Sequence, residues 1–433
     1  MGWHLPTLIW ESGQLVTSYF VTVPLVIVTM DGALPGVLYR ESWSAARYAH
    51  KMRILFVIAI GIVVFGACSP QGGAPTPTTT SIVDTSLDST TTPREIATTS
   101  RAPTPTTTST TTTTSTTLPP LIIAFAGDTS FTHGSETRDP LGDITGWLSD
   151  PDLMFVNLET VIAEPDVGVE VDNTFTFKSP PVSVDLLNAA GIDAVQIGNN
   201  HILDWGPDGV VRTVELLDEG GIAHAGAGVD IEAAYAPAFI EVKGWRIGFV
   251  SFSRIPCHFA ASGKNTRPQV AWACDPFIRD TIQAVKDASQ GTDFVIVMVH
   301  WGIERNNCPE PYQRELARVW AQFGADLIIG GHPHVLQGVE QVEGSWLVNS
   351  TGNFAFPSAR GPSSYSAIYE FTVTQTDVTL KVKPVRIVAG RPKPADESDS
   401  ARILADLDQW SFGYDFDADG AAVASDEPSV CDG

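Results

Sequence analysis

The chain has 433 residues, 43% of them apolar, and a formal net charge of −24 at neutral pH. Six basic and six acidic residues cancel within residues 1–120, so the whole negative charge lies on residues 121–433. A domain this acidic, with no run of Lys or Arg, repels nucleic acid and anionic lipid headgroups. We therefore expect no nucleic-acid partner, and there is enough apolar sequence for a large core.

Residues 52–68 have the pattern of a lipoprotein-type signal peptide. One Arg precedes an uncharged apolar stretch that is shorter than the ~20 residues of a membrane-spanning helix, and the segment ends at Cys68. This ending resembles a bacterial lipobox, which predicts a lipidated Cys68 and a domain anchored to the extracytoplasmic face of the cell membrane. An uncleaved membrane anchor is the alternative, and it would leave the domain on the same side.

Residues 1–51 fit neither a signal peptide nor a domain. A start assignment upstream of the true one, with initiation near Met52, would explain them, and we expect them to be absent from the mature protein. Residues 69–120 are dominated by Thr, Ser and Pro, as in "TPTTTSTTTTTSTTLPP". Such a segment offers almost no apolar surface to offset the entropy of ordering, which predicts a disordered stalk.

Short apolar runs that end in polar residues recur after the stalk and predict buried β-strands. They are "LIIAFAGD", "LMFVNLE", "AVQIGNNH", "FVIVMVHWG" and "LIIGGHPH". Helical segments are predicted between several of them, over residues 182–190, 208–219, 276–289 and 311–323. The alternation predicts an α/β fold whose helices cover a sheet that is buried on both faces.

Two hairpins are predicted, with turns at Lys243-Gly244 and Glu343-Gly344. They add antiparallel strands, so we expect mixed sheets, two of them packed together. A further alternating pair turns near Thr376-Asp377. Residues 391–433 form an acidic C-terminal extension, and we expect it to fray from about Gly420.

Four cysteines follow the predicted lipidation site, at positions 257, 274, 308 and 431. An even number of cysteines in an oxidising location predicts one or two disulfides. We favour a bridge between Cys257 and Cys274 because they bracket one loop-like insertion. The cysteine spacings contain no CxxC pair, which disfavours a structural zinc cluster.

Polar side chains gather where the predicted strands end, and ligands of open α/β sheets bind at that edge. These side chains are Asp128, Asn157, Glu159, Asn200, His201, His300, His332 and His334. Pro333 restricts His332 to extended backbone, which would point His332 and His334 to the same side. Imidazole, carboxylate and amide ligands suit Mn, Fe or Zn, and a pair of such ions would clamp a phosphate and activate water.

The ordered motifs "FAGD", "NLE", "GNNHILDWG", "HWGIE", "GADLIIGGHPHVLQGVE" and "NSTGNFAF" resemble those of the CapA/PgsA family of poly-γ-glutamate capsule synthesis proteins. That family belongs to the calcineurin-like metallophosphatase superfamily, whose fold is two packed β-sheets flanked by helices. The resemblance spans about Leu121 to Val388. It implies a metallophosphatase-like domain over residues 121–390.

The resemblance also implies roles for individual residues. Asp128 and His334 would hold a first metal ion, Asn200, His300 and His332 a second, and Glu159 would bridge the two. His201 would be the general acid for the leaving group, oriented by Asp204. The chain departs from the superfamily pattern at Ser130, which stands where a histidine ligand is usual, and at Glu159, which replaces an aspartate. One tightly held ion or two ions are both compatible with this ligand set.

Three further residues are candidates for binding substrate. They are Asn157, Glu304 and Asn353. Glu304 would contact substrate or orient a ligand, and its alternative role is a salt bridge with Arg305 or another base.

Two functions remain open from the sequence. The first is a metal-dependent hydrolase that acts on a phosphoester or on an anionic envelope polymer. The second is a non-catalytic metal-binding component for assembly or export in a membrane-bound polymer synthase complex. A purely structural adhesin would leave the shared polar site unexplained.

Overall fold

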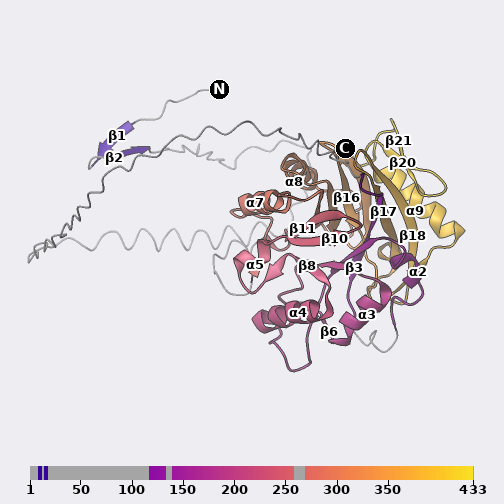
Figure 1. Ribbon diagram of the computed structural model, residues 1–433, viewed down its shortest axis with the longest axis horizontal. Coiled ribbons are helices and arrows are strands. Elements are labelled where there is room, and N and C mark those ends of the chain that lie inside the picture. The colour runs from indigo at the N-terminus through magenta and orange to yellow at the C-terminus, as the bar shows by residue number, and fades with distance from the viewer. Residues whose placement is uncertain (1–7, 12–13, 18–116, 133–138, 258–268, 433) are drawn as a thin grey trace, which may run out of the picture. The chain divides into compact units, whose positions relative to one another are not determined.

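The computed structural model describes residues 8–11, 14–17, 117–132, 139–257 and 269–432 (Figure 1). The chain divides into two units, residues 1–106 and 107–433. In the first unit, β1 (Leu8–Glu11) pairs antiparallel with β2 (Gln14–Thr17). The predicted signal peptide with Cys68 and most of the predicted stalk lie outside the described residues. Within the described ranges, no helix has the length and apolar character needed to cross a membrane.

The second unit contains a mixed sheet of seven strands, four from its first half and three from residues 365–394. Its strands in spatial order are β19 (Arg391–Pro394), β18 (Val378–Val388), β17 (Tyr365–Val373), β3 (Leu121–Thr129), β4 (Leu153–Leu158), β7 (Ala194–Gln196) and β8 (Ala223–Ala225). Strands β3, β4, β7 and β8 run parallel, and the other neighbours pair antiparallel. The turn predicted near Thr376-Asp377 joins β17 to β18.

A second mixed sheet has six strands. They are β10 (Ala238–Val242), β11 (Trp245–Ser253), β13 (Phe294–His300), β14 (Leu327–Gly331), β16 (Ser345–Thr351) and β15 (Leu336–Val342). The four inner strands are parallel, and the two predicted hairpins supply the antiparallel edges. All four hairpin-turn residues, Lys243, Gly244, Glu343 and Gly344, have positive φ, as a two-residue type I′ turn requires.

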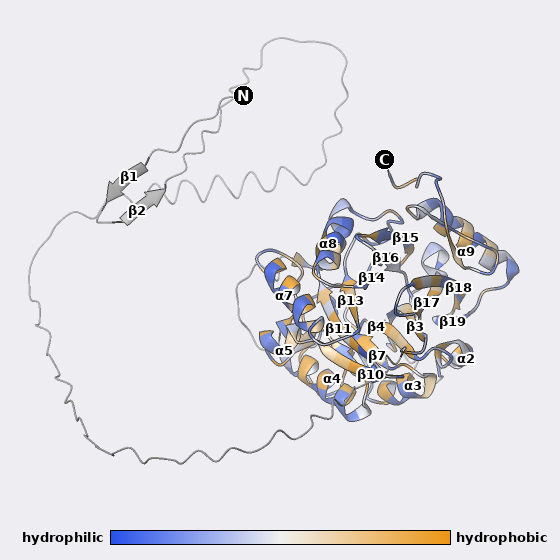
Figure 2. Ribbon diagram, turned by 45° about the horizontal axis from the view of Figure 1, so that its top comes forward, coloured by the Kyte–Doolittle hydropathy of each residue, from blue (hydrophilic) through white to orange (hydrophobic). Residues whose placement is uncertain are grey.

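Helices cover the outer faces of both sheets, and the inner faces pack on each other (Figure 1). Against the first sheet lie α2 (Thr145–Leu148), α3 (Val182–Ala190) and α4 (Gly206–Gly220); against the second lie α5 (Ile231–Tyr235), α7 (Ile278–Ala288) and α8 (Pro311–Gln322). The shared core joins Phe125 and Phe155 of one sheet to Phe249 of the other, with ring centroids 5.1 and 5.2 Å apart. The hydrophobic colouring of the central strands in Figure 2 follows this core. The predicted α/β architecture of two mixed sheets flanked by helices is confirmed.

Shorter elements complete the described part of the domain. They are the pairs β5 (Val161–Ile162) with β6 (Lys178–Ser179), β9 (Ala227–Gly228) with β12 (Gln269–Val270), β20 (Tyr414–Phe416) with β21 (Ala422–Ala424), and the 3₁₀ helix η2 (Gly361–Ser364).

The C-terminal extension is ordered, so the expectation of fraying from Gly420 was wrong. Helix α9 (Glu397–Trp410) buries Ile403, Leu404 and Leu407 in the core that the two sheets share. This spacing places the three side chains on one helical face, and their burial stabilises the segment despite its acidic surface. Strand β21 continues the order past Gly420.

Two disulfides bridge the four cysteines. Cys257 bonds to Cys274, as predicted, and Cys308 bonds to Cys431. The second bridge spans 123 residues and ties the end of the extension to the loop between β13 and α8. It is a second reason why the extension does not fray.

Candidate metal centre

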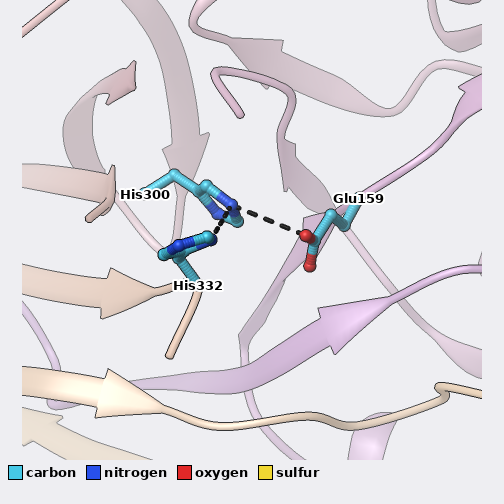
Figure 3. Close-up of side chains that lie close together, drawn as sticks. All are labelled: Glu159, His300 and His332. Carbon is cyan, nitrogen blue, oxygen red and sulfur yellow. Dashed lines mark hydrogen bonds and ion pairs between the residues drawn. The ribbon is translucent and has the colours of Figure 1, made fainter. Parts of the chain in front are cut away.

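The predicted ligands come together where the carboxyl ends of parallel strands from the two sheets meet. Asp128 lies near the end of β3, and Glu159 directly follows β4. His300 ends β13 and His332 directly follows β14 in the other sheet. Figure 3 shows the imidazoles of His300 and His332 facing the carboxylate of Glu159. Pairing of β3 with β4 and of β13 with β14 fixes the side chains in register.

Two groups of side chains have the geometry to hold a metal ion. One is Glu159, His300 and His332, and the other is Asp128, Glu159 and His334; within each group the ligand atoms lie within 4.8 Å of one another. Glu159 belongs to both groups. This is the division into two sites with a bridging carboxylate that the resemblance implied.

The carboxylate of Glu159 is the strongest sign of a bound cation at this centre. Its side chain is fully buried, and neither carboxylate oxygen has a hydrogen-bond partner among the described residues. Instead, Oε1 faces three imidazole Nε2 atoms, those of His300 at 3.5 Å, His201 at 3.6 Å and His334 at 3.8 Å. Burial, and then the charge of Asp128, raise the pKa of Glu159 well above its usual value. A divalent cation would satisfy both oxygens.

Asn200 supplies a second unsatisfied oxygen. Its Oδ1 is buried and has no hydrogen-bond partner in the part of the chain that the structure describes. Buried side-chain oxygens are normally hydrogen-bonded, so an oxygen without a partner points to a ligand. This fits the role that the resemblance gave to Asn200.

The histidines of the first group are electrostatically suited to a metal. His332 Nδ1 lies 3.1 Å from His300 Nε2. Burial, followed by the neighbouring imidazoles, lowers the pKa of His300 well below its usual value, and burial is also the main cause that lowers the pKa of His332 to about 3. Both rings are therefore neutral, which is the form that coordinates a metal.

His334 lies beside the carboxylates. Burial disfavours its charged form, but Glu159, Asp128 and Asn353 together outweigh burial and raise its pKa to about 10. Its Nδ1 lies 3.0 Å from Asp128 Oδ2 and 2.8 Å from Asn353 Oδ1, which leaves Nε2 directed at Glu159. The ring is thus held with Nε2 directed into the ligand group, and this nitrogen would bind a metal by giving up its proton.

The backbone around Pro333 differs from the prediction. His332 has φ +95° and His334 has φ +57°, so neither residue is extended. A positive φ is uncommon for a residue with a side chain, and outside turns it is a strain that clusters at functional sites. The two imidazoles still converge, with ring centroids 5.9 Å apart, because the strained turn aims them at neighbouring positions.

Gly331 allows the close approach of Asp128. A Cβ at Gly331 would lie 2.8 Å from Asp128 Oδ1, too close without displacing the carboxylate. The same carboxylate accepts hydrogen bonds from Asn157 Nδ2 at 2.8 Å and from the backbone N–H of His332 at 3.3 Å. Asp128 is therefore fixed from both sheets.

Asn157 and Asn353 both hydrogen-bond to residues of the metal centre, and Asn353 also lines the pocket that leads to it. Asn157 is buried, and its Nδ2 contacts both Asp128 and His300 Nδ1, at 2.8 and 3.1 Å. Asn353 accepts from His334 at Oδ1 and donates from Nδ2 to the carbonyl oxygens of His334 and Ser363. Both amides thus use hydrogen-bonding groups to orient metal-site residues, and a role in binding substrate stays a prediction.

Asn199 is a functional candidate that the sequence reasoning missed. Its Nδ2 donates to Asn157 Oδ1 at 3.1 Å and to the carbonyl of Leu158 at 2.8 Å, while its Oδ1 accepts from the backbone N–H of His201. It therefore ties the loop after β7 to the end of β4. The two adjacent asparagines in "GNNH" indicated a functional amide at this place. The sequence pattern alone does not show which of the two would orient the site and which would bind a metal.

His201 and Asp204 form a buried pair beside Glu159. His201 Nδ1 lies 2.7 Å from Asp204 Oδ2, and the same oxygen accepts the backbone N–H of Phe177 at 2.7 Å. Nδ1 therefore donates to the carboxylate, and Nε2 is presented toward Glu159. The Phe177 ring packs on the imidazole with centroids 4.1 Å apart.

An open pocket of about 290 Å³ leads to this centre. Its lining includes His201, His334, Glu304 and Arg305, with an aromatic wall of Phe175, Phe177 and Phe356. Within the described ranges, Glu304 forms no salt bridge with Arg305 or any other base. The structure therefore shows Glu304 in the pocket lining and does not show the salt bridge that was its alternative role. Ser130 also lines the pocket, and its hydroxyl is hydrogen-bonded to that of Thr132. At this position, where the superfamily has a histidine, the chain therefore has no nitrogen ligand for a metal.

Comparison with known proteins places this chain in a family. Residues 122–358 match the family model described as "Bacterial capsule synthesis protein PGA_cap". The chain is 28% identical over 269 residues to "Capsule biosynthesis protein CapA" of Bacillus anthracis, covering 61% of this chain and 65% of that protein. It is 29% identical over 245 residues to "PGA biosynthesis protein CapA" of Bacillus subtilis, covering 56% and 63%. The chain thus spans less than two thirds of the length of these two relatives.

Two further likenesses add to this comparison. A "Probable polyglutamine synthesis accessory protein" of Mycobacterium tuberculosis is 28% identical over 301 residues, covering 63% of this chain and 77% of that protein. A solved structure described as a novel phosphatase of Mycoplasma pneumoniae aligns with 63% of this chain and 94% of its own, at 14% identity and a TM-score of 0.38. That structural likeness is too low to bear on activity.

Proposed function

Because this chain belongs to the bacterial capsule synthesis family PGA_cap, we propose that it is a metal-dependent hydrolase acting in the synthesis of poly-γ-glutamate or a related anionic envelope polymer. The observation that supports it most is the buried Glu159 carboxylate, which has no hydrogen-bond partner among the described residues and is shared by two groups of metal ligands. A buried charge of this kind is costly unless it is paired.

The residues present fit one or two divalent transition-metal ions, Mn, Fe or Zn. Glu159, His300 and His332 would hold one ion together with Asn200 Oδ1, and Asp128, Glu159 and His334 would hold the other. Bound metal would supply Lewis acidity toward a phosphoryl or acyl oxygen and would lower the pKa of a coordinated water.

His201 would be the general acid. Asp204 accepts the Nδ1–H of His201, so Nε2 is the nitrogen that faces the site and carries the proton for the leaving group. The Phe177 ring shields this pair from water, and the main-chain N–H of Phe177 keeps Asp204 in place. The orientation of the His201 ring is thus set by residues of two different loops.

The setting of this activity is proposed to be the extracytoplasmic face of the cell membrane, through a lipid anchor at Cys68. Two disulfides in the described domain support an oxidising location. The substrate would be an anionic envelope polymer or a phosphoester, and membrane-bound synthase subunits would be the partners. The acidity of residues 121–433 argues against nucleic acid as a partner.

The test compares two histidines that are each paired with an aspartate. Metal-loaded wild type should hydrolyse model phosphoesters or γ-linked glutamate polymer, and chelation should abolish turnover. His201→Gln should lower kcat by about 10²–10⁴-fold with metal content unchanged. His224→Gln is the matched control, because His224 pairs with Asp218 at 3.1 Å at the surface and lies outside the pocket. Equal activity of the two variants would contradict the assignment.

A second function is supported by the reduced ligand set. Ser130 offers no nitrogen ligand, so the group with Asp128, Glu159 and His334 has three protein ligands. A site with this weaker set would serve a non-catalytic assembly or export component that binds metal for structure. Stoichiometric metal without turnover on either substrate class would favour this alternative over the hydrolase.

A further inference from the structure

The pocket must attract a negatively charged substrate although the domain carries a net charge of −24. Among the described residues that line it, Arg305 is the only Lys or Arg. The pocket volume of about 290 Å³ admits a small group rather than a length of polymer. His334 lines the pocket too, but its Nδ1 faces Asp128 and Asn353, so Arg305 is the cationic side chain there that is not held by the metal-site residues.

Arg305 is left free to bind. Its side chain is exposed and makes no ion pair or hydrogen bond with the described part of the chain, even though Glu304 is its neighbour. Other arginines of the domain are engaged; Arg314, for example, donates to Glu340 at 2.7 and 2.9 Å. A guanidinium beside a metal centre without a carboxylate partner is suited to an incoming anion.

The main chain holds Arg305 against the metal-ligand turn. Its backbone N–H donates to the carbonyl of Pro333 at 2.7 Å, between His332 and His334. Its φ is +63°, a conformation that costs free energy for a residue with a side chain. The base of the side chain is therefore fixed next to the two histidines.

We propose that Arg305 receives an anionic group of the substrate, a carboxylate or a phosphate, while the adjoining part of the substrate reaches the metal centre. This inference rests on the proposed function for the identity of the substrate, and on the geometry alone for the anion. Glu304 lines the same pocket, and its charge acts on the buried Glu159. Glu304 therefore opposes anion binding. Removing the charge of Glu304 should strengthen anion binding, whereas removing the charge of Arg305 should weaken it.

The experiment measures equilibrium binding rather than turnover. Inorganic phosphate and a labelled γ-linked glutamate oligomer are titrated into the whole protein by calorimetry and fluorescence anisotropy, with metal and with chelator. Arg305→Gln should weaken binding about 10–100-fold, the range expected for a hydrogen bond between charged groups, and Arg305→Lys should weaken it less. Glu304→Gln should tighten it. Arg279→Gln, on the exposed surface of α7 outside the pocket, should leave it unchanged.

The two probes distinguish the sources of the anion, because the one whose affinity depends on Arg305 identifies the group. Binding that depends on Arg305 without hydrolysis of any substrate would uphold this inference and count against the hydrolase. The inference is overturned if neither probe binds, if Arg305→Gln binds like wild type, or if Arg279→Gln weakens binding as much. Unchanged metal content in Arg305→Gln keeps a loss of binding from being ascribed to a lost metal.

Discussion

Replacing Glu159 with Gln should uncouple the protein from its metal while leaving the fold in place. The amide has the shape of the carboxyl group, and neither oxygen of Glu159 has a hydrogen bond to lose within the described part of the chain. In the presence of a chelator we therefore expect unfolding free energies of the variant and wild type to agree within about 1 kcal/mol.

The difference appears when metal is added. At a free metal concentration of 100 Kd, binding stabilises the wild type by about 2.7 kcal/mol, which corresponds to a rise in Tm of roughly 4 °C for a domain the size of residues 107–433. Glu159 belongs to both ligand groups, so its loss should weaken binding at least about 100-fold. At the same metal concentration the variant would then gain only about 0.4 kcal/mol, or a rise near 1 °C.

Thermal unfolding with Mn, Fe or Zn, and with chelator, measures these shifts, and elemental analysis gives the metal per chain. Glu340→Gln is a matched control, since Glu340 is also a buried glutamate but pairs with Arg314 away from the ligand groups. Its unfolding temperature should fall, yet its metal-induced rise should equal that of wild type. The reasoning would be refuted if metal left the Tm of wild type unchanged, or if metal raised the Tm of Glu159→Gln as much as that of wild type.

Three further changes test other parts of the structure. Asp204→Asn should reduce kcat by about 10²-fold or more at unchanged KM and metal content, because an amide no longer stabilises the charged ring of His201. Steady-state kinetics measure this effect, and a kcat equal to that of wild type would contradict it. Burial raises the pKa of Asp326 from 3.8 to about 6, so the folded state binds that proton more tightly than the unfolded state and stability falls as pH rises through this range. Asp326→Asn should therefore gain up to about 3 kcal/mol on wild type between pH 4 and pH 8 in urea unfolding, and parallel curves would contradict this. Exchanging Cys308 and Cys431 for Ser should cost about 2–5 kcal/mol, and a Tm equal to that of wild type would exclude a stabilising bridge.

The sequence predicted the elements well because their signals are local. The apolar run of β13 stops at His300, and a proline opens α8 at the predicted residue. The glycine-containing hairpin turns are equally local, since positive φ at two adjacent positions favours few residue types. Parallel strands then bring their carboxyl ends together, which is why the predicted ligands lie side by side.

What failed depends on contacts between distant segments. Pro333 predicted extended backbone at His332, but the hydrogen bond from Arg305 and the contact with Asp128 hold a strained turn there instead. The contacts that Asn157 and Asn353 make with metal-site residues could not be predicted either, because nothing in a single chain segment shows which partners these amides meet. For the same reason Asn199 could not be separated from its neighbour.

The pairing of Cys308 with Cys431 has a practical consequence for handling this protein. The loop that carries Arg305 ends near Cys308, so a covalent bond connects the rim of the pocket to the last residues of the chain. A truncation made to trim an acidic tail, or expression in a reducing host, would release that rim even though it lies far from the cut in sequence. Reporter groups and affinity tags are for this reason better attached between Cys68 and residue 107, where the second unit begins.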